Sequence, residues 1–192
     1  MKRLHKILGL GALTVALAVP FVSNTPVWAQ LELAGEAIAE NLQREEQIKL
    51  VLSAEKKVIE IDKKGQSKIT WQQISGKRVK VIPSDIIRYT LNGENVSDRA
   101  VKNLVVNQPI PQQTKYVLGS ATVAQNTGAE TTYSIDSGNS FVKNPVIKVT
   151  LADGTVEERP APAEAYTHIR WNFGDAVNSG VALNATYEVE VR

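Results

Sequence analysis

Short segments in which apolar and polar residues alternate recur along the chain from residue 48 to residue 192. Successive side chains of a strand point to opposite faces, so this alternation is typical of strands with one buried and one solvated face. In the last segment, Tyr187, Val189 and Val191 share one face, and Glu188 and Glu190 share the other. The strands expected from this pattern occupy residues 48–53, 56–61, 68–74, 77–82, 85–96, 101–110, 114–122, 130–135, 144–151, 166–173 and 182–191.

Turn-forming residues separate these segments at the spacing expected of two packed sheets. Asp153-Gly154 gives the strongest hairpin prediction, because glycine accepts the positive φ that a tight hairpin turn needs. Residues 160–165 predict a stiff, extended link, because Pro160 and Pro162 have no amide donor. Strands do not alternate with helical segments, which disfavours a parallel nucleotide-binding sheet.

The same alternation predicts the hydrophobic core. Ile87 and Leu91 alternate with Ile86, so this strand carries apolar side chains on both faces and is expected in the middle of a sheet. We expect an all-β domain, an antiparallel sandwich of seven to nine strands over residues 48–192. Its core is expected to contain Tyr89, Leu104, Val106, Trp171, Tyr187 and Val189.

Two segments precede this domain and differ from it in composition. Residues 30–47 are rich in helix-forming Ala, Glu, Leu and Gln, with apolar residues at three- and four-residue steps, which predicts a short helical or poorly ordered lead-in. This lead-in either packs on its own domain or docks on a partner.

Residues 1–29 have the pattern of a signal peptide. Lys2, Arg3 and Lys6 form a basic start, the apolar run from Ile7 to Val19 follows, and Ala29 provides a small residue for cleavage. The apolar run has 13 residues, whereas a helix needs about 20 to cross a bilayer. We therefore expect an exported chain, cleaved after Ala29, in the periplasm or outside the cell, with no membrane span in the mature part.

Overall charge and cysteine content narrow the classes of partner and site to expect. The chain has 22 basic and 20 acidic residues, and three of the basic ones lie in the predicted signal peptide. Such a balanced mature chain gives no electrostatic reason to expect nucleic acid or an anionic membrane as partner. The absence of cysteine excludes disulfides, thiolate metal sites and a lipid anchor at the first mature residue, which is Gln30.

Residues 81–122 contain two successive motifs rich in polar and β-forming residues. The first is formed by Pro83, Asp85, Tyr89, Thr90 and Asn95, and the second by Val101, Asn103, Leu104, Val106, Pro109, Ile110 and Pro111. These residues resemble the bacterial conserved-repeat family called domain of unknown function 11, and the resemblance extends over about residues 79–192. It implies an immunoglobulin-like sandwich in exported and surface bacterial proteins, and no activity. Ser84 and Gln108 depart from the family pattern, where Gly and Asp are usual.

Residues 134–141 fit the Asp-box pattern, which also occurs in sialidase propellers. Ser134, Asp136, Gly138, Ser140 and Phe141 occupy its fixed positions. The spacing suits a hairpin turn in which polar side chains bind turn amides and glycine supplies a positive φ. A structural hairpin is the favoured interpretation, and a saccharide site is the alternative.

The remaining candidates do not converge on a reaction. His168 is the only histidine of the predicted mature chain, so no zinc site is expected there, and it is expected to face solvent on its strand. Glu157, Glu158 and Glu164 lie on a proline-flanked charged stretch. Trp71 is the candidate for an exposed aromatic that binds a ligand. No nucleophile, phosphate-loop or dinucleotide motif is present, and we expect no catalytic residue, cofactor or metal.

The predicted function is therefore a non-catalytic structural or protein-binding module in the bacterial periplasm, envelope or extracellular space. Its expected partner is an envelope or surface protein, and the module itself is expected to be monomeric or weakly associated. The alternative is a carbohydrate-binding or carbohydrate-active secreted protein, which the Asp-box pattern and Trp71 suggest.

Overall fold

The computed structural model describes residues 14–16, 48–75, 79–124 and 128–192 of the chain. These residues form strands and one turn of 3₁₀ helix (η3, Ala163–Ala165), with no α-helix among them. Within this part of the chain, no helix is long and apolar enough to cross a membrane. The strands are β1 (Thr14–Ala16), β2 (Ile48–Ile61), β3 (Ser67–Gln73), β4 (Ile86–Asn95), β5 (Val101–Lys102), β6 (Val105–Pro109), β7 (Thr114–Tyr116), β8 (Thr122–Val123), β9 (Glu130–Ser134), β10 (Val146–Thr150), β11 (Val156–Pro160), β12 (His168–Asn172), β13 (Ala176–Val177) and β14 (Ala182–Val191).

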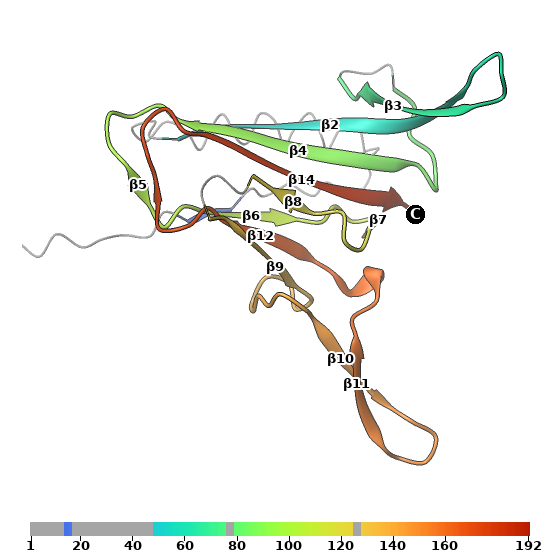
Figure 1. The fold of residues 1–192 in the computed structure, drawn as a ribbon. Coiled ribbons are helices and arrows are strands. Elements are labelled where there is room, and N and C mark those ends of the chain that lie inside the picture. Colours follow the sequence, from blue (N-terminus) through green and yellow to red (C-terminus); the bar gives the residue numbers. More distant parts are fainter. Residues whose placement is uncertain (1–13, 17–47, 76–78, 125–127) are drawn as a thin grey trace, which may run out of the picture.

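Two sheets lie on either side of the core (Figure 1). The larger sheet has the order β3-β2-β4-β14-β7, with β8 also paired to β14, and the second has the order β1-β6-β12-β9. Neighbouring strands are antiparallel, except that β1 runs parallel to β6. The prediction of an all-β fold with antiparallel pairing is confirmed.

Two small ribbons complete the described structure. β5 pairs with β13, and β10 pairs with β11 in a hairpin that points away from the two sheets (Figure 1). Gly154 has φ 86° in the turn of this hairpin, and its amide donates to the carbonyl of Leu151 at 2.9 Å. The hairpin predicted at Asp153-Gly154 is therefore confirmed.

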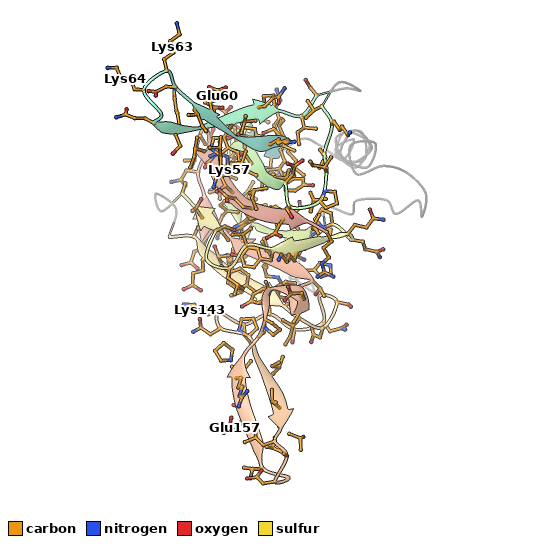
Figure 2. The ribbon with its side chains drawn as sticks, turned by 90° about the vertical axis from the view of Figure 1, so that its right-hand side faces the viewer. Lys57, Glu60, Lys63, Lys64, Lys143 and Glu157 are labelled. Atoms are coloured by element: carbon orange, nitrogen blue, oxygen red, sulfur yellow. The ribbon has the colours of Figure 1, made fainter. Side chains whose placement is uncertain are left out.

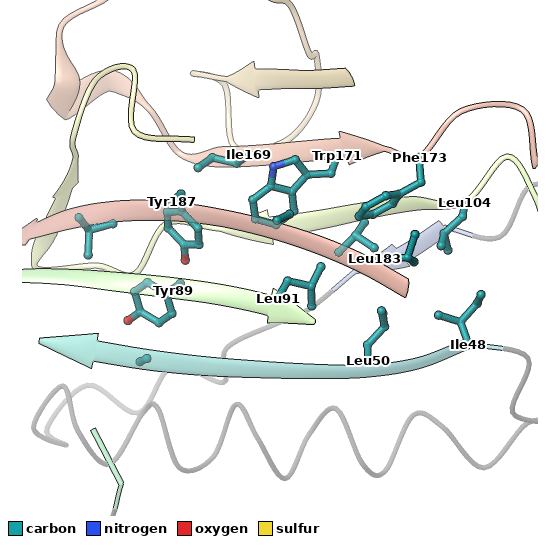
Figure 3. Close-up of a cluster of buried hydrophobic side chains, with 14 of the residues drawn as sticks. Ile48, Leu50, Tyr89, Leu91, Leu104, Ile169, Trp171, Phe173, Leu183 and Tyr187 are labelled. Carbon is teal, nitrogen blue, oxygen red and sulfur yellow. The ribbon is translucent and has the colours of Figure 1, made fainter. Parts of the chain in front are cut away.

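The core contains every residue that the alternation placed there. Tyr89 is 1% exposed, and Leu104, Val106, Trp171, Tyr187 and Val189 are fully buried. Figure 3 shows Tyr89 and Tyr187 of the larger sheet facing Trp171 of the second sheet, with Ile48 and Leu50 of β2 at one end of the cluster. β4 lies between β2 and β14, so its predicted position inside a sheet is also confirmed.

Several predicted strand boundaries were wrong. The segments 48–53 and 56–61 are one strand, because Ala54 and Glu55 pair with β4 without interruption. Segment 101–110 is two strands, β5 and β6, because Asn103 has φ 52° between them. Segment 114–122 is also divided, because Gly119, with φ 76°, lies in the turn that separates β7 from β8. No strand occurs at residues 79–82 of the segment 77–82. The described part of residues 48–192 contains thirteen strands, β2 to β14, rather than seven to nine, since several are only two or three residues long.

Two further predictions concern segments that were not predicted to be strands. The proline-rich link at 160–165 is extended at Pro162 but turns into η3 at Ala163–Ala165, which corrects the prediction of a fully extended link. β1 lies within the predicted signal peptide, whereas the predicted lead-in helix at 30–47 lies outside the described residues.

Replacement of Leu104 by alanine tests the core. The side chain is fully buried between the sheets, so its truncation leaves a cavity and is expected to lower the free energy of unfolding by about 2–5 kcal/mol. Ile61→Ala is the matched control, because Ile61 is 75% exposed, and its effect should stay within about 0.5 kcal/mol. Urea unfolding followed by tryptophan fluorescence measures both, and equal effects would contradict the placement of Leu104 in the core.

Candidate functional site

The Asp-box segment forms a tight turn after β9. Ser134 Oγ donates to Asp136 Oδ1 at 2.6 Å and accepts the amide of Gly138 at 2.8 Å. The Ser140 amide donates to Asp136 Oδ1 at 2.9 Å, and the Ser140 hydroxyl donates to Oδ2. Backbone hydrogen bonds in both directions between Tyr133 and Val142 close the loop. Both carboxylate oxygens of Asp136 are thus engaged within the turn.

Hydrogen bonding also sets the charge state of this turn. The hydroxyl of Ser134, followed by the hydroxyl and amide of Ser140, lowers the pKa of Asp136 to about 2. Hydrogen bonds to a carboxylate favour its charged form, because they would be lost or reversed on protonation. Asp136 therefore remains an ionised anchor of the loop at every pH near neutrality.

The base of the turn rests on β12. Gly138, with φ 86°, lies against the ring of His168, since a Cβ at Gly138 would lie 3.4 Å from that ring. Phe141 contacts the edge of the same ring, and the guanidinium of Arg170 lies 3.5 Å from the centre of the Phe141 ring. Burial lowers the pKa of His168, although the charge of Asp136 partly opposes this effect. His168 was predicted to face solvent, but its half-buried ring packs under the turn.

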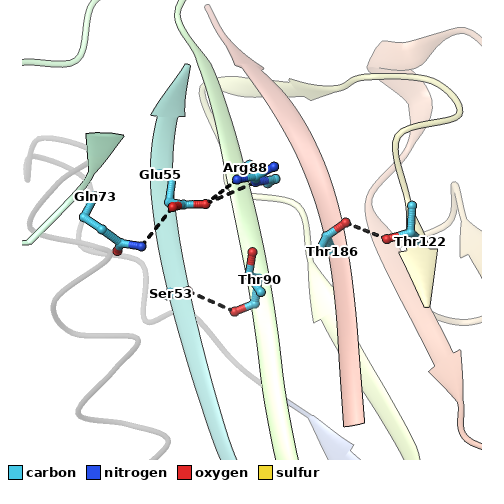
Figure 4. Close-up of polar contacts among 7 residues, drawn as sticks. All are labelled: Ser53, Glu55, Gln73, Arg88, Thr90, Thr122 and Thr186. Atoms are coloured by element: carbon cyan, nitrogen blue, oxygen red, sulfur yellow. Dashed lines mark hydrogen bonds and ion pairs between the residues drawn. The ribbon is translucent and has the colours of Figure 1, made fainter. Parts of the chain in front are cut away.

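Trp71 lies at the other end of the molecule, on the outer face of the larger sheet. The guanidinium of Arg88 is 3.9 Å from the centre of its ring, a cation–π geometry. Arg88 also donates to Glu55 at 2.7 Å, and Glu55 accepts from Gln73 at 3.0 Å (Figure 4). Trp71 is half-buried rather than fully exposed, and one face of its ring is occupied by Arg88.

The structure does not bring the sequence-predicted candidates together. Trp71 belongs to β3 at the edge of the larger sheet, whereas Asp136 and its partners follow β9 at the edge of the second sheet. Of Glu157, Glu158 and Glu164, Glu157 pairs with Arg159 at 2.8 Å on the β10–β11 hairpin, where both side chains are about half exposed. Among the described residues, no group of three His, Asp or Glu side chains is arranged to hold a metal ion.

Two groups of exposed aliphatic residues were not identified from the sequence. Ile59, Ile61 and Ile69 lie on the β2–β3 hairpin, and Val146 and Val156 lie on the β10–β11 hairpin. The alternation places each on one face of its strand, but only the positions of neighbouring strands show that nothing among the described residues covers that face. The two projecting hairpins are therefore a distinctive feature of the described surface.

No known protein family, curated protein or solved structure matches this chain. The resemblance of residues 79–192 to the family called domain of unknown function 11 therefore stays a prediction that depends on the motifs alone.

The turn around Asp136 makes a testable contribution to stability. The folded pKa of about 2 is below the ~3.9 of an unfolded aspartate, so the stabilisation is complete above about pH 4 and is lost as the pH falls towards 2. We expect Asp136→Asn to lower the melting temperature at pH 6 and to lower it much less at pH 2. Thermal unfolding at both pH values checks this. A difference between variant and wild type that is equal at both values would contradict the charged role of Asp136.

Proposed function

We propose that this chain is a non-catalytic, exported bacterial module with an immunoglobulin-like sandwich, and that it binds a protein of the envelope or cell surface. The two facing sheets and their shared core support such a sandwich. Lack of catalysis is supported by the internal use of the candidate groups: both oxygens of Asp136 bind its own turn, and His168 packs beneath it. Export is supported by the basic start and short apolar run of residues 1–29.

The β10–β11 hairpin is the observation on which the protein-binding role depends. Val146 and Val156 are 48% and 57% exposed, and both lie on one face of the ribbon because Val146 opposes Pro160 and Thr150 opposes Val156. A two-stranded hairpin is marginally stable by itself, and its unpaired edges accept a further strand. Within the described residues, β10 and β11 pair only with each other. We infer that a partner protein contacts this hairpin.

The charges of the hairpin suit a protein partner. On the face that carries Val146 and Val156, Lys148 lies opposite Glu158, between the two valines. Glu157 and Arg159 lie on the other face of the ribbon. Apolar and charged side chains therefore share one exposed face, and charges of both signs at an interface select the partner and fix its orientation. The carbohydrate-binding alternative has weaker support, since Arg88 occupies one face of the Trp71 ring and the Asp136 turn is closed.

Site-specific photo-crosslinking tests the partner. A benzophenone amino acid at position 156, in the bacterium that encodes the chain, is expected to give one dominant adduct with an envelope or surface protein. Position 61 is the matched control, because it is also exposed but lies on the hairpin at the opposite end (Figure 1). No adduct at position 156, or the same adduct from both positions, would contradict the proposal.

A further inference from the structure

The β2–β3 hairpin extends beyond the larger sheet. β2 pairs with β4 from Ile48 to Lys56, and its remaining residues up to Ile61 pair only with β3 among the described strands. Figure 1 shows this end of β2 and β3 projecting past β4. The tip of this hairpin, defined as residues 57–71, is therefore a convex, two-stranded projection.

One face of the tip is aliphatic. Ile59 opposes Ile69 directly, and Ile61 follows on the same face, because alternate residues of a strand point the same way. Their exposed fractions are 63%, 53% and 75%. Lys57 and Trp71 form the next pair on this face towards the sheet. Three adjacent exposed isoleucines on a projection form a continuous apolar patch, which marks an interaction site more often than scattered exposed residues do.

Lysines surround this patch. Lys63 and Lys64 lie in the turn and extend outward from it, and Lys57 lies on the strand behind them (Figure 2). Lys68 lies opposite Glu60 on the face away from the isoleucines. With Lys68, the tip has four lysines against two acids. In the described structure, none of these lysines forms an ion pair.

The two acids of the tip offset only half of the charge of its four lysines. Asp62 Oδ1 accepts the amides of Lys64 and Gln66, both at 2.8 Å, and so shapes the turn. Glu60 lies on the face opposite the isoleucines, because it alternates with Ile59 and Ile61. The apolar patch therefore combines with a local excess of positive charge, although the charge of the whole chain is nearly balanced.

We infer that the tip of the β2–β3 hairpin docks on an anionic lipid surface. The isoleucine side chains enter the boundary between headgroups and acyl chains. The lysine ammonium groups, carried on flexible aliphatic stems, contact the negatively charged headgroups. Apolar burial and electrostatic attraction act together in interfacial binding, and neither suffices alone for a patch of three residues. A convex tip suits insertion into a planar surface.

The other hairpin does not fit this role. β10–β11 also has exposed valines, but Asp153, Glu157 and Glu158 outnumber Lys148 and Arg159 there, so an anionic surface repels it. This contrast gives the inference a matched internal control. It also makes the inference independent of the protein-binding proposal, which concerns β10–β11 alone.

A single-cysteine label tests the inference, because the chain contains no cysteine of its own. The variants Ile61→Cys and, as the control, Val156→Cys are purified from cells that export the protein. Each is then labelled with an environment-sensitive fluorophore at its single cysteine. With vesicles of equal phosphatidylglycerol and phosphatidylcholine, the label at position 61 should shift to shorter wavelength, and the label at 156 should not. Vesicles of phosphatidylcholine alone should produce no shift at position 61. An unshifted label at 61 with anionic vesicles overturns the inference and favours a protein ligand for the tip.

Charge reversal separates headgroup attraction from apolar adhesion. Each lysine near a charged surface raises affinity roughly fivefold, so Lys63→Glu with Lys64→Glu should weaken vesicle binding by roughly twenty-five-fold or more. Ile59→Ser with Ile61→Ser should also weaken it, whereas Val146→Ser with Val156→Ser should leave it unchanged. Every variant has the same N-terminal segment, so a difference in vesicle binding between variants comes from the substituted hairpin. Equal binding by the charge-reversed variant and the wild type overturns the inference.

Discussion

The pairing of β4 with β14 is the interaction on which the rest of the structure depends. The two strands pair in register from Ile86 opposite Glu190 to Glu94 opposite Ala182, in the middle of the larger sheet. Tyr89 and Tyr187 stack across this pair with ring centres 4.9 Å apart, and Trp171 from the second sheet packs on Tyr187. Since the chain has no cysteine to form a disulfide, this apolar contact between the sheets has to supply the stability. The pair positions the β2–β3 hairpin, because β2 pairs with β4. The β10–β11 hairpin connects β9 and β12 of the second sheet, which packs on the same core.

The sequence predicted those features that depend on local alternation or on a single turn. The boundaries of β14 and the burial of Tyr187 and Val189 followed from period-two alternation, which states directly which side chains face inward. Alternation does not state where pairing stops. The break at Asn103 comes from its positive φ, and residues 79–82 alternate without a strand, so neither could be predicted from hydropathy.

The same distinction explains which candidate sites were predicted. The Asp136 turn lies within eight consecutive residues, so its spacing alone indicated that a polar side chain binds a turn amide, as Asp136 does with the amide of Ser140. The environment of Trp71 depends on Arg88, which is distant in sequence. The two side chains meet because their strands, β3 and β4, both pair with β2. The exposure of the isoleucines at the β2–β3 tip depends on where β4 begins, a long-range feature that alternation does not record. Both proposed binding surfaces depend on such long-range features rather than on local spacing.

Hydrogen–deuterium exchange of backbone amides tests most directly the claim that one rigid core positions two projecting hairpins. Amides that pair β4 with β14 should exchange only through global unfolding, because they lie at the centre of the sheet. Amides of β10–β11 and of residues 57–71 should exchange faster by several orders of magnitude, since each belongs to a two-stranded projection outside the core. Uniform protection along the chain, or faster exchange at the β4–β14 pair than at the hairpins, would contradict this account.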